Sequence, residues 1–223
     1  MNVDAVIVAA GSSTRFGGED KLFADLCGKP VLAWSLAAYA AAESIDRIVV
    51  VASSENAERV KQLAAAWAPA KFFSIAPGGL RRRESVEAGL RLCTSRYVAI
   101  HDGARPLTTP AIIERCIAAA VGGSGAIAAV PVTDTIKEVS GNTITAHPDR
   151  ARLWAAQTPQ VVLRQVWLDA AAMSDNDETD DAAMLSRLGL ECAIVEGSPE
   201  NLKITRPLDL DIARLIVCSR AQP

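Results

Sequence analysis

The sequence predicts an α/β protein, with a mostly parallel sheet covered by helices on both faces and a projecting β-hairpin arm. Residues 5–10 and 48–51 are unbroken apolar runs, typical of strands buried on both faces. Such runs alternate with helix-like segments at about 25 residues per unit, which predicts right-handed crossovers. The 223 residues contain no linker, repeat or low-complexity tract. We therefore expect one domain, residues 1–223.

The first half of the chain predicts a regular series of strands and helices. Apolar runs ended by small or polar residues mark the strands, and Pro30 stands where a helix can begin. Residues 22–29 are interpreted as a connector. The expected strands are 3–10, 47–52, 71–76 and 97–100, and the expected helices are 31–42, 57–66 and 84–93.

The second half is less regular and contains the arm. Residues 132–150 alternate in polarity around Gly141-Asn142, which predicts two short strands joined by a tight turn. We interpret them as an arm that leaves the sheet, the alternative being an edge hairpin packed on its own domain. The other expected elements are helices at 110–121, 163–173, 180–188 and 208–217 and strands at 126–130 and 192–195.

Composition restricts the partners. A net charge of −3 gives no general attraction to nucleic acid or anionic membranes, so phosphate binding must come from locally placed Arg and Lys. No apolar stretch approaches the roughly 20 residues of a membrane span. The five cysteines are scattered and form no C-x-x-C pair, which is typical of a reducing compartment. We expect a cytoplasmic protein with a small-molecule partner.

The loop after the first strand has the character of a phosphate-binding loop. Gly11-Ser12-Ser13-Thr14 offers backbone N–H groups without bulky side chains, and Arg15 and Lys21 add two cations. Neither the Walker A pattern nor the dinucleotide Gly-x-Gly-x-x-Gly pattern fits. Two cations on one loop suit the charge that builds on a phosphorus centre under attack. The alternative is a solvated loop whose charges face water.

Two further strand ends carry suggestive residues, because ligands of doubly wound sheets bind beyond the carboxyl ends of the strands. After the third strand, Gly78-Gly79 can admit a flat base and Ser85 can offer a hydrogen bond. For at least two of the arginines at 81–83 we expect a solvated helix start rather than a role in the site. After the fourth strand, Asp102 is a natural Mg²⁺ anchor beside a phosphate loop. His101 is better explained as a hydrogen-bonded packing residue.

Other chemistries have little support. The chain has two histidines, no Ser/His/Asp constellation and no cluster of Cys or His ligands, so hydrolytic and zinc mechanisms are disfavoured. Later in the chain, Arg150 and Lys203 could each hold a phosphate of a second substrate, and a role as plain surface cations is equally open.

Taken in order along the whole chain, these motifs resemble the 2-C-methyl-D-erythritol 4-phosphate cytidylyltransferases of the non-mevalonate isoprenoid pathway. Ala-Ala-Gly alone occurs in many sugar-nucleotide transferases, whereas the ordered set is specific to this family and to the ribitol-5-phosphate cytidylyltransferases. The motifs are Ala9 to Arg15 with Lys21, His101 to Pro106, Asp134 to Lys137, Asp149-Arg150, Leu153-Trp154, Gln157 to Gln160, Thr179 to Ala182 and Asn201 to Pro207.

The resemblance implies a Rossmann-like fold of the nucleotide-diphospho-sugar transferase type and a Mg²⁺-dependent transfer of CMP from CTP to a sugar-alcohol phosphate. It implies that Arg15 and Lys21 act at the α-phosphate, that Asp102 holds Mg²⁺, and that the arm joins two subunits in a homodimer. The acceptor would be positioned by Arg150, Lys203, Arg105, Thr135, Thr158 and Thr179. The nucleotide would be surrounded by Ala10, Gly11, Ser12, Gly78, Gly79, Arg82 and Ser85.

Two residues depart from the family pattern. Asp20 stands where most members place proline before the lysine, and Leu80 stands where the usual residue is acidic or polar. The run Asp20-Lys21-Leu22 is also similar to the molybdenum-cofactor nucleotidyltransferases, so guanylyl transfer is one alternative, with ribitol 5-phosphate as acceptor a second. A nucleotide-binding module that has lost turnover is a third, although it would have little need of so many retained cations.

Overall fold

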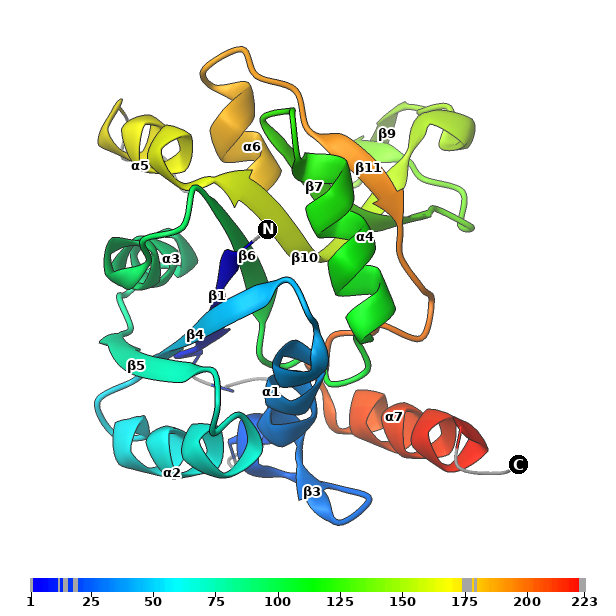
Figure 1. Cartoon of the computed structure of the whole chain (residues 1–223). Coiled ribbons are helices and arrows are strands. Elements are labelled where there is room, and N and C mark those ends of the chain that lie inside the picture. The colour runs from blue at the N-terminus through cyan, green and yellow to red at the C-terminus, as the bar shows by residue number, and fades with distance from the viewer. Residues whose placement is uncertain are drawn as a thin grey trace.

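The computed structural model describes residues 2–11, 13, 16–17, 20–173, 178 and 180–220. Its centre is a seven-stranded sheet in the order β11-β7-β10-β6-β1-β4-β5 (Figure 1). Of the six strand pairs in this sheet, four are parallel and the two made by β10 are antiparallel. The mostly parallel sheet is therefore confirmed. The strands are β1 (Val3–Ala9), β4 (Ile45–Ala52), β5 (Phe72–Pro77), β6 (Tyr97–Asp102), β7 (Gly125–Pro131), β10 (Trp154–Leu163) and β11 (Ala193–Glu196).

Helices cover both faces of this sheet, as the unbroken apolar strands predicted. Alternate residues of β1 point to opposite faces, so Ile7 joins one core cluster and Val6 the other. The first cluster lies under α1 (Val31–Ala41), α2 (Ala57–Trp67) and α4 (Pro110–Ala120). The second lies under α3 (Arg82–Leu92), α5 (Arg164–Met173) and α6 (Asp181–Ser186).

A third, smaller core lies beneath the carboxyl edge of the sheet. The residues interpreted as a connector contain the 3₁₀ turn η2 (Lys21–Phe23) and a hairpin of β2 (Asp25–Leu26) with β3 (Lys29–Pro30). The hairpin and the closing helix α7 (Pro207–Arg220) contribute Leu26 and Leu210 to the same cluster. The turn Cys27-Gly28, which joins β2 to β3, was not predicted. Cys27 has a left-handed backbone, φ +53°, and such a position is usually occupied by Asn, Asp or Gly.

The strand β10 was not predicted. Its ten residues include Gln157-Thr158-Pro159-Gln160, a sequence that indicates a loop because proline cannot donate to a sheet ladder. The ladder to β7 shifts register between Ala156 and Gln160, and this irregularity accommodates the proline inside the sheet. The polar segment is thereby held in the middle of the molecule, next to the end of β6.

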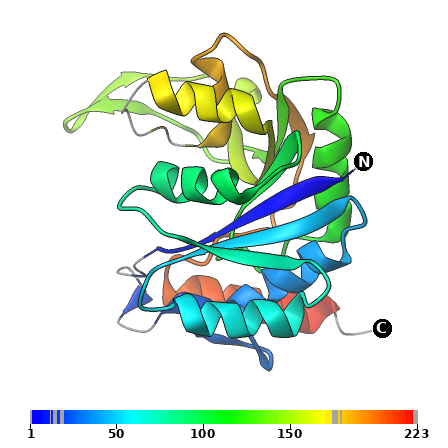
Figure 2. The ribbon, with the colours of Figure 1, turned by 60° about the vertical axis from the view of Figure 1, so that its left-hand side comes forward.

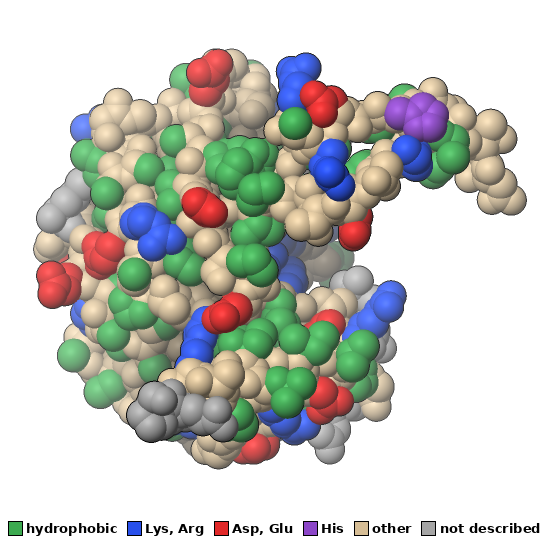
Figure 3. Space-filling view, turned by 90° about the vertical axis from the view of Figure 1, so that its right-hand side faces the viewer, with side chains coloured by type: hydrophobic (Ala, Val, Ile, Leu, Met, Phe, Trp, Pro, Cys, Tyr) green, Lys and Arg blue, Asp and Glu red, His purple; other side chains and the backbone are tan. Residues whose placement is uncertain are grey.

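The arm, residues 132–150, is a two-stranded ribbon, as predicted. Its strands β8 (Glu138–Ser140) and β9 (Thr143–Ala146) pair antiparallel around Gly141-Asn142, and η3 (Arg150–Arg152) returns the chain to β10. The ribbon extends away from the sheet in Figure 2, and Figure 3 shows the surface hollowed beneath it. Val139 and Ile144 are 63% and 52% exposed. Within the described residues, no helix is long and apolar enough to cross a membrane.

Candidate active site

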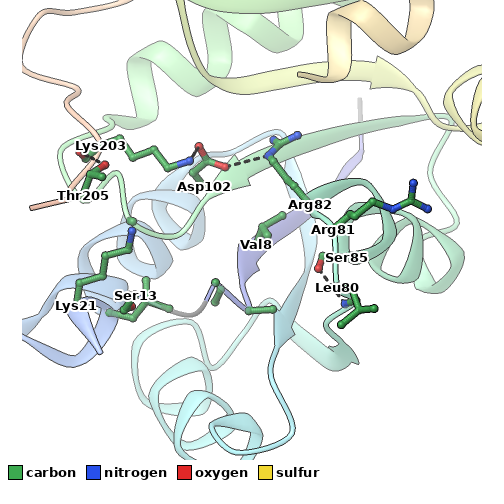
Figure 4. A pocket seen from close by; sticks show the side chains of 16 residues that line it. Val8, Ser13, Lys21, Leu80, Arg81, Arg82, Ser85, Asp102, Lys203 and Thr205 are labelled. Atoms are coloured by element: carbon green, nitrogen blue, oxygen red, sulfur yellow. Dashed lines mark hydrogen bonds and ion pairs between the residues drawn. The ribbon is translucent and has the colours of Figure 1, made fainter. Parts of the chain in front are cut away.

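A pocket of about 490 Å³ lies at the carboxyl ends of β1 and β6 (Figure 4). The glycine-containing segment after β1, the start of α3 and the segment before α7 close around it. This is the edge at which ligands of doubly wound sheets are expected. The lining residues are Val8, Ala9, Ala10, Gly11, Ser13, Lys21, Leu22, Gly79, Leu80, Arg81, Arg82, Ser85, Asp102, Ala104, Lys203 and Thr205.

Glycine is required where the segment after β5 meets the segment after β1. A Cβ on Gly78 would lie 2.3 Å from the Cβ of Ala10, so only glycine permits the two backbones to approach so closely. The Gly79 N–H donates to the Ser85 hydroxyl over 3.0 Å. Leu80 is fully exposed at the rim. This end of the pocket is lined by the small residues Ala10, Gly11, Gly79 and Ser85, and it could take a planar base.

Asp102 is the centre of charge in the pocket. Its carboxylate lies 2.8 Å from Lys203 Nζ, 3.3 Å from Arg82 Nε and 3.8 Å from Arg105 Nε. Burial would raise the pKa of Asp102, but Arg82 and then Lys203 lower it well below the usual aspartate value. The carboxylate is therefore ionised and holds three cations from three separate segments.

Arg82 bridges two carboxylates. Besides Asp102, its Nη2 donates over 2.8 Å to Asp181, whose side chain is 1% exposed. Burial lowers the pKa of Arg82, but Asp181 and Asp102 raise it further, so the net shift is upward. None of the three consecutive arginines is exposed, and Arg81 pairs with Glu84 at 2.8 Å. The expectation of a solvated helix start for at least two of them was wrong.

A second pocket of about 210 Å³ adjoins the first and shares Arg82, Asp102 and Lys203 with it. Arg105 and Thr158 belong to this smaller pocket. Its remaining lining residues are Ala156, Gln157, Gln160 and Asp180. One carboxylate with its cations thus forms the common wall of two polar pockets, each of which could hold an anionic group.

A buried network fixes the wall of the smaller pocket. His101 Nε2 faces the Arg105 carbonyl at 3.2 Å, and Nδ1 faces the Thr158 hydroxyl at 2.9 Å. Since a carbonyl only accepts, Nε2 carries the proton and the Thr158 hydroxyl donates to Nδ1. The same hydroxyl accepts from the Asp102 N–H over 3.1 Å. Burial lowers the pKa of His101 to about 3, so the ring is a neutral packing residue, as expected. Thr158 therefore forms part of the wall of the smaller pocket, and its hydroxyl proton is already donated to His101 Nδ1.

Three of the predicted site residues that the structure describes, Thr135, Arg150 and Gly78, do not line these pockets. Thr135 and Arg150 lie on the arm, both exposed, and Arg150 Nη1 donates to the Thr133 carbonyl over 2.6 Å. Ser12, Arg15 and Thr179 lie outside the described residues. All the other predicted site residues line one or both pockets except Gly78, which packs behind Ala10.

The donor set suits a magnesium ion held mainly by a nucleotide. Asp102 offers one ionised carboxylate, and the described part of the chain contains no cluster of three or more Asp, Glu, His or Cys side chains that could hold a metal ion. Mg²⁺ usually takes one or two carboxylates, with phosphate oxygens and water completing its shell. A second protein carboxylate is not needed for such a site.

The sequence model of the 2-C-methyl-D-erythritol 4-phosphate cytidylyltransferase family matches residues 3–219 of this chain. The chain belongs to this family. It is 45% identical over 224 residues to the protein of that name from Prochlorococcus marinus (strain MIT 9313), covering 97% of this chain and 98% of the relative. The similarity to the protein of that name from Dehalococcoides mccartyi (strain ATCC BAA-2266 / KCTC 15142 / 195) is 42% over 217 residues, covering 96% of each.

Solved structures agree with the cytidylyltransferase-family fold. The crystal structure of the 4-diphosphocytidyl-2C-methyl-D-erythritol synthase from Anaerococcus prevotii DSM 20548 superposes with a TM-score of 0.86 over 97% of this chain and 96% of that one, at 23% identity. At this identity the comparison concerns the fold alone. The Rossmann-like sheet that the family resemblance implied is confirmed.

Two supporting residues of this cytidylyltransferase-family site escaped prediction. Asp181 holds Arg82 and also accepts from Trp167 Nε1 over 3.1 Å. Asn201 donates to the Thr158 carbonyl over 2.9 Å. Both lie in motifs already noted in the sequence, but their partners are 99 and 43 positions away. The sequence motifs showed that these two segments matter to the site. Which residues they contact follows only from how α6 and residues 201–205 pack in the fold.

Proposed function

We propose that this chain transfers CMP from CTP to 2-C-methyl-D-erythritol 4-phosphate, forming 4-diphosphocytidyl-2-C-methyl-D-erythritol and releasing pyrophosphate. Family membership supports the two substrates. The observation that carries the proposal is the shared wall of the two pockets, where Arg82, Asp102 and Lys203 face both cavities. A nucleotide in the larger pocket and a phosphorylated acceptor in the smaller one would meet at this wall.

In the proposed reaction, a phosphate oxygen of the acceptor attacks the α-phosphorus of CTP and pyrophosphate leaves from the opposite side. The chain's residues align two polyanions and neutralise the charge of the crowded transition state. Lys21 and Arg15 act at the α-phosphate. The base lies against Ala10, Gly79 and Ser85, and Gly78 allows the close approach behind them.

The acceptor phosphate is assigned to Lys203 and Arg105, with Arg150, Thr135 and Thr179 completing its site. Because Arg150 and Thr135 are exposed on the arm, we assign them to the site of a second subunit in a homodimer. The exposed Val139 and Ile144 of the arm support a docking role, since an isolated two-stranded ribbon is only marginally stable.

Mg²⁺ belongs to the same proposal, with Asp102 as its protein ligand. When bound, the ion would neutralise phosphate oxygens and help to orient them. Asp102 would exchange part of its contact with Lys203 and Arg82 for the ion, and these two cations would then be available to the phosphates.

We also propose that the protein is cytoplasmic, because its cysteines are scattered and form no C-x-x-C pair.

A pyrophosphate-release assay tests the proposed function. CTP, GTP, ATP and UTP are each combined with 2-C-methyl-D-erythritol 4-phosphate and with ribitol 5-phosphate, with Mg²⁺ present. We expect turnover with CTP and the methylerythritol phosphate only. Turnover with ribitol 5-phosphate or with GTP in place of this pair would reject the assignment, and CTP binding by calorimetry without turnover would indicate a nucleotide-binding module.

A further inference from the structure

The carboxylate of Asp20 joins three separate segments beside the larger pocket. Its Oδ1 accepts from the Ser13 hydroxyl over 2.8 Å and from the Leu22 N–H over 3.1 Å, and its Oδ2 accepts from Asn56 Nδ2 over 2.6 Å. Asp20 is half-buried. Both of its oxygens are therefore used, and each points toward a different part of the fold.

These three segments are the two ends of the loop that follows β1 and the start of α2. Ser13 lies two residues after Gly11 and has a left-handed backbone, φ +51°. Leu22 is in η2, directly after Lys21. Asn56 is the residue before α2, just beyond β4. Ser13 and Lys21 both line the pocket and lie on the same side of it in Figure 4.

A helix cap alone does not account for this arrangement. Capping η2 explains the bond from the Leu22 N–H, whereas the bonds to Ser13 and Asn56 span 7 and 36 positions. A carboxylate beside a site for a triphosphate also repels the ligand electrostatically. Proline, expected here from the family pattern, would restrict φ but could accept none of the three bonds.

We infer that Asp20 is a positioning residue of the transfer site: by tying Ser13 and η2 to Asn56, it determines where Lys21 meets the nucleotide. This inference rests on the proposed function. Asp20 does not itself contact the reacting atoms. It acts through Lys21, which follows it directly in the chain, and its effect should disappear when Lys21 is removed.

The first test is a double-mutant cycle in the pyrophosphate-release assay. Asp20→Ala should lower kcat about 10- to 100-fold, the scale expected when a catalytic group shifts by about 1 Å, and should change the KM for CTP much less. In a Lys21→Ala background, Asp20→Ala should have little further effect on kcat, because coupled residues are not additive. Asp25→Ala is the matched control, since the exposed Asp25 carboxylate accepts from the nearby Gly28 N–H and does not line the pocket.

Unchanged kcat in Asp20→Ala, or a loss that adds in full to that of Lys21→Ala, would overturn the inference. If Asp20→Ala does not fold, Asn56→Ala removes one bond of the three and should lower kcat in the same direction. A normal kcat in this foldable variant would equally count against the positioning role.

A readout that does not depend on turnover separates this inference from the proposed function. Trypsin cleavage after Lys21, followed by mass spectrometry, should be several-fold faster in Asp20→Ala than in the unchanged protein and in Asp25→Ala. If the unchanged protein shows no transfer activity but this difference is present, the proposed function fails and the anchoring of the loop stands. Equal cleavage rates would show that Asp20 does not hold the loop.

Discussion

Asp102 organises the site by electrostatics before any substrate binds. One ionised carboxylate holds Lys203, Arg82 and Arg105 close together, although three like charges would otherwise repel one another. Arg82 is also held from the other side by Asp181. The cations are thus preorganised for an anionic ligand, and little reorganisation is needed during the reaction.

Asp102→Asn keeps the shape of the side chain and removes its charge. We expect a large fall in kcat and a higher Mg²⁺ concentration for half-maximal rate, because both the proposed metal ligand and the partner of the three cations are weakened. Circular dichroism should show an intact fold. Normal activity and an unchanged Mg²⁺ dependence would mean that the nucleotide alone holds the ion.

Lys21→Ala tests a lining residue of the larger pocket that we assign to the α-phosphate. Since its interaction with the α-phosphate is assigned to the transition state, kcat should fall far more than CTP binding weakens. Steady-state kinetics, with calorimetric titration of CTP, measures the two effects. A higher KM with the same kcat would make Lys21 a binding residue only.

At pH 8, the exposed and the buried cysteines should differ in how fast an alkylating reagent modifies them. Burial raises the pKa of Cys93 and Cys116 to about 12 each, so at pH 8 only about one thiol in 10⁴ is ionised. Cys218 is exposed. Iodoacetamide at pH 8 should alkylate Cys218 in the folded protein and leave Cys93 and Cys116 unmodified, with all five labelled in denaturant, as mass spectrometry can measure. Equal labelling rates in the folded state would contradict the burial.

At the residue scale, the sequence is most informative at strand ends. Lys21, Asp102 and Ser85 were predicted because the carboxyl ends of parallel strands meet at one edge of a sheet. The role of Asp181 was not predictable, since it depends on the packing of α6 against α5 and β10, which brings Asp181 to Arg82. Nor was the three-way bonding of Asp20, because nothing in its local sequence indicates Asn56 as a partner.

At the scale of elements, buried parallel strands were predicted well and β10 was missed. A buried parallel strand is an apolar run, and its composition alone reveals it. The middle of β10 is instead polar: it carries Gln157, Thr158 and Gln160 into the site. The polar residues that make β10 useful to the site also hide it from a search for apolar runs.

The contact of α3 with β1 requires Gly89. A Cβ there would lie 2.5 Å from Val6 Cγ1 and 3.1 Å from Val51 Cγ2. Gly89→Ala should therefore lower the free energy of unfolding by about 1–3 kcal/mol, because overpacking exceeds the gain in helix propensity. In the control Gly123→Ala, the new Cβ has only the Ala120 carbonyl at 3.8 Å. Urea unfolding should show the loss in Gly89→Ala alone, and equal stabilities would contradict the close packing.

At the scale of the whole molecule, the arm decides whether the site is complete in one chain. Arg150 is exposed and bonded to the arm's own Thr133 carbonyl. If Arg150 serves the site of a second subunit, mixing the inactive variants Lys21→Ala and Arg150→Ala under conditions that exchange subunits should restore activity. One site of each mixed dimer then regains both residues. The pyrophosphate-release assay measures the recovery.

The unmixed variants, treated in the same way, are the controls for this experiment. If Arg150 works within its own chain, every site in the mixture stays defective and no activity returns. That result would reject the cross-subunit assignment of the arm and leave the proposed transfer reaction standing.

The place of β10 between β6 and β7 has a consequence for the order of biosynthesis. β7 cannot join the sheet until β10, its link to β6, has left the ribosome about 30 residues later. At about 5–20 residues per second, the growing chain carries β7 without this neighbour for seconds. Thr158 and Gln160 arrive with the same strand. The strand that joins the two halves of the sheet thus also brings one wall of the smaller pocket, so a nascent chain cannot assemble this wall before β6 and β7 are joined, and the pocket is complete only when Asp180 and Lys203 follow.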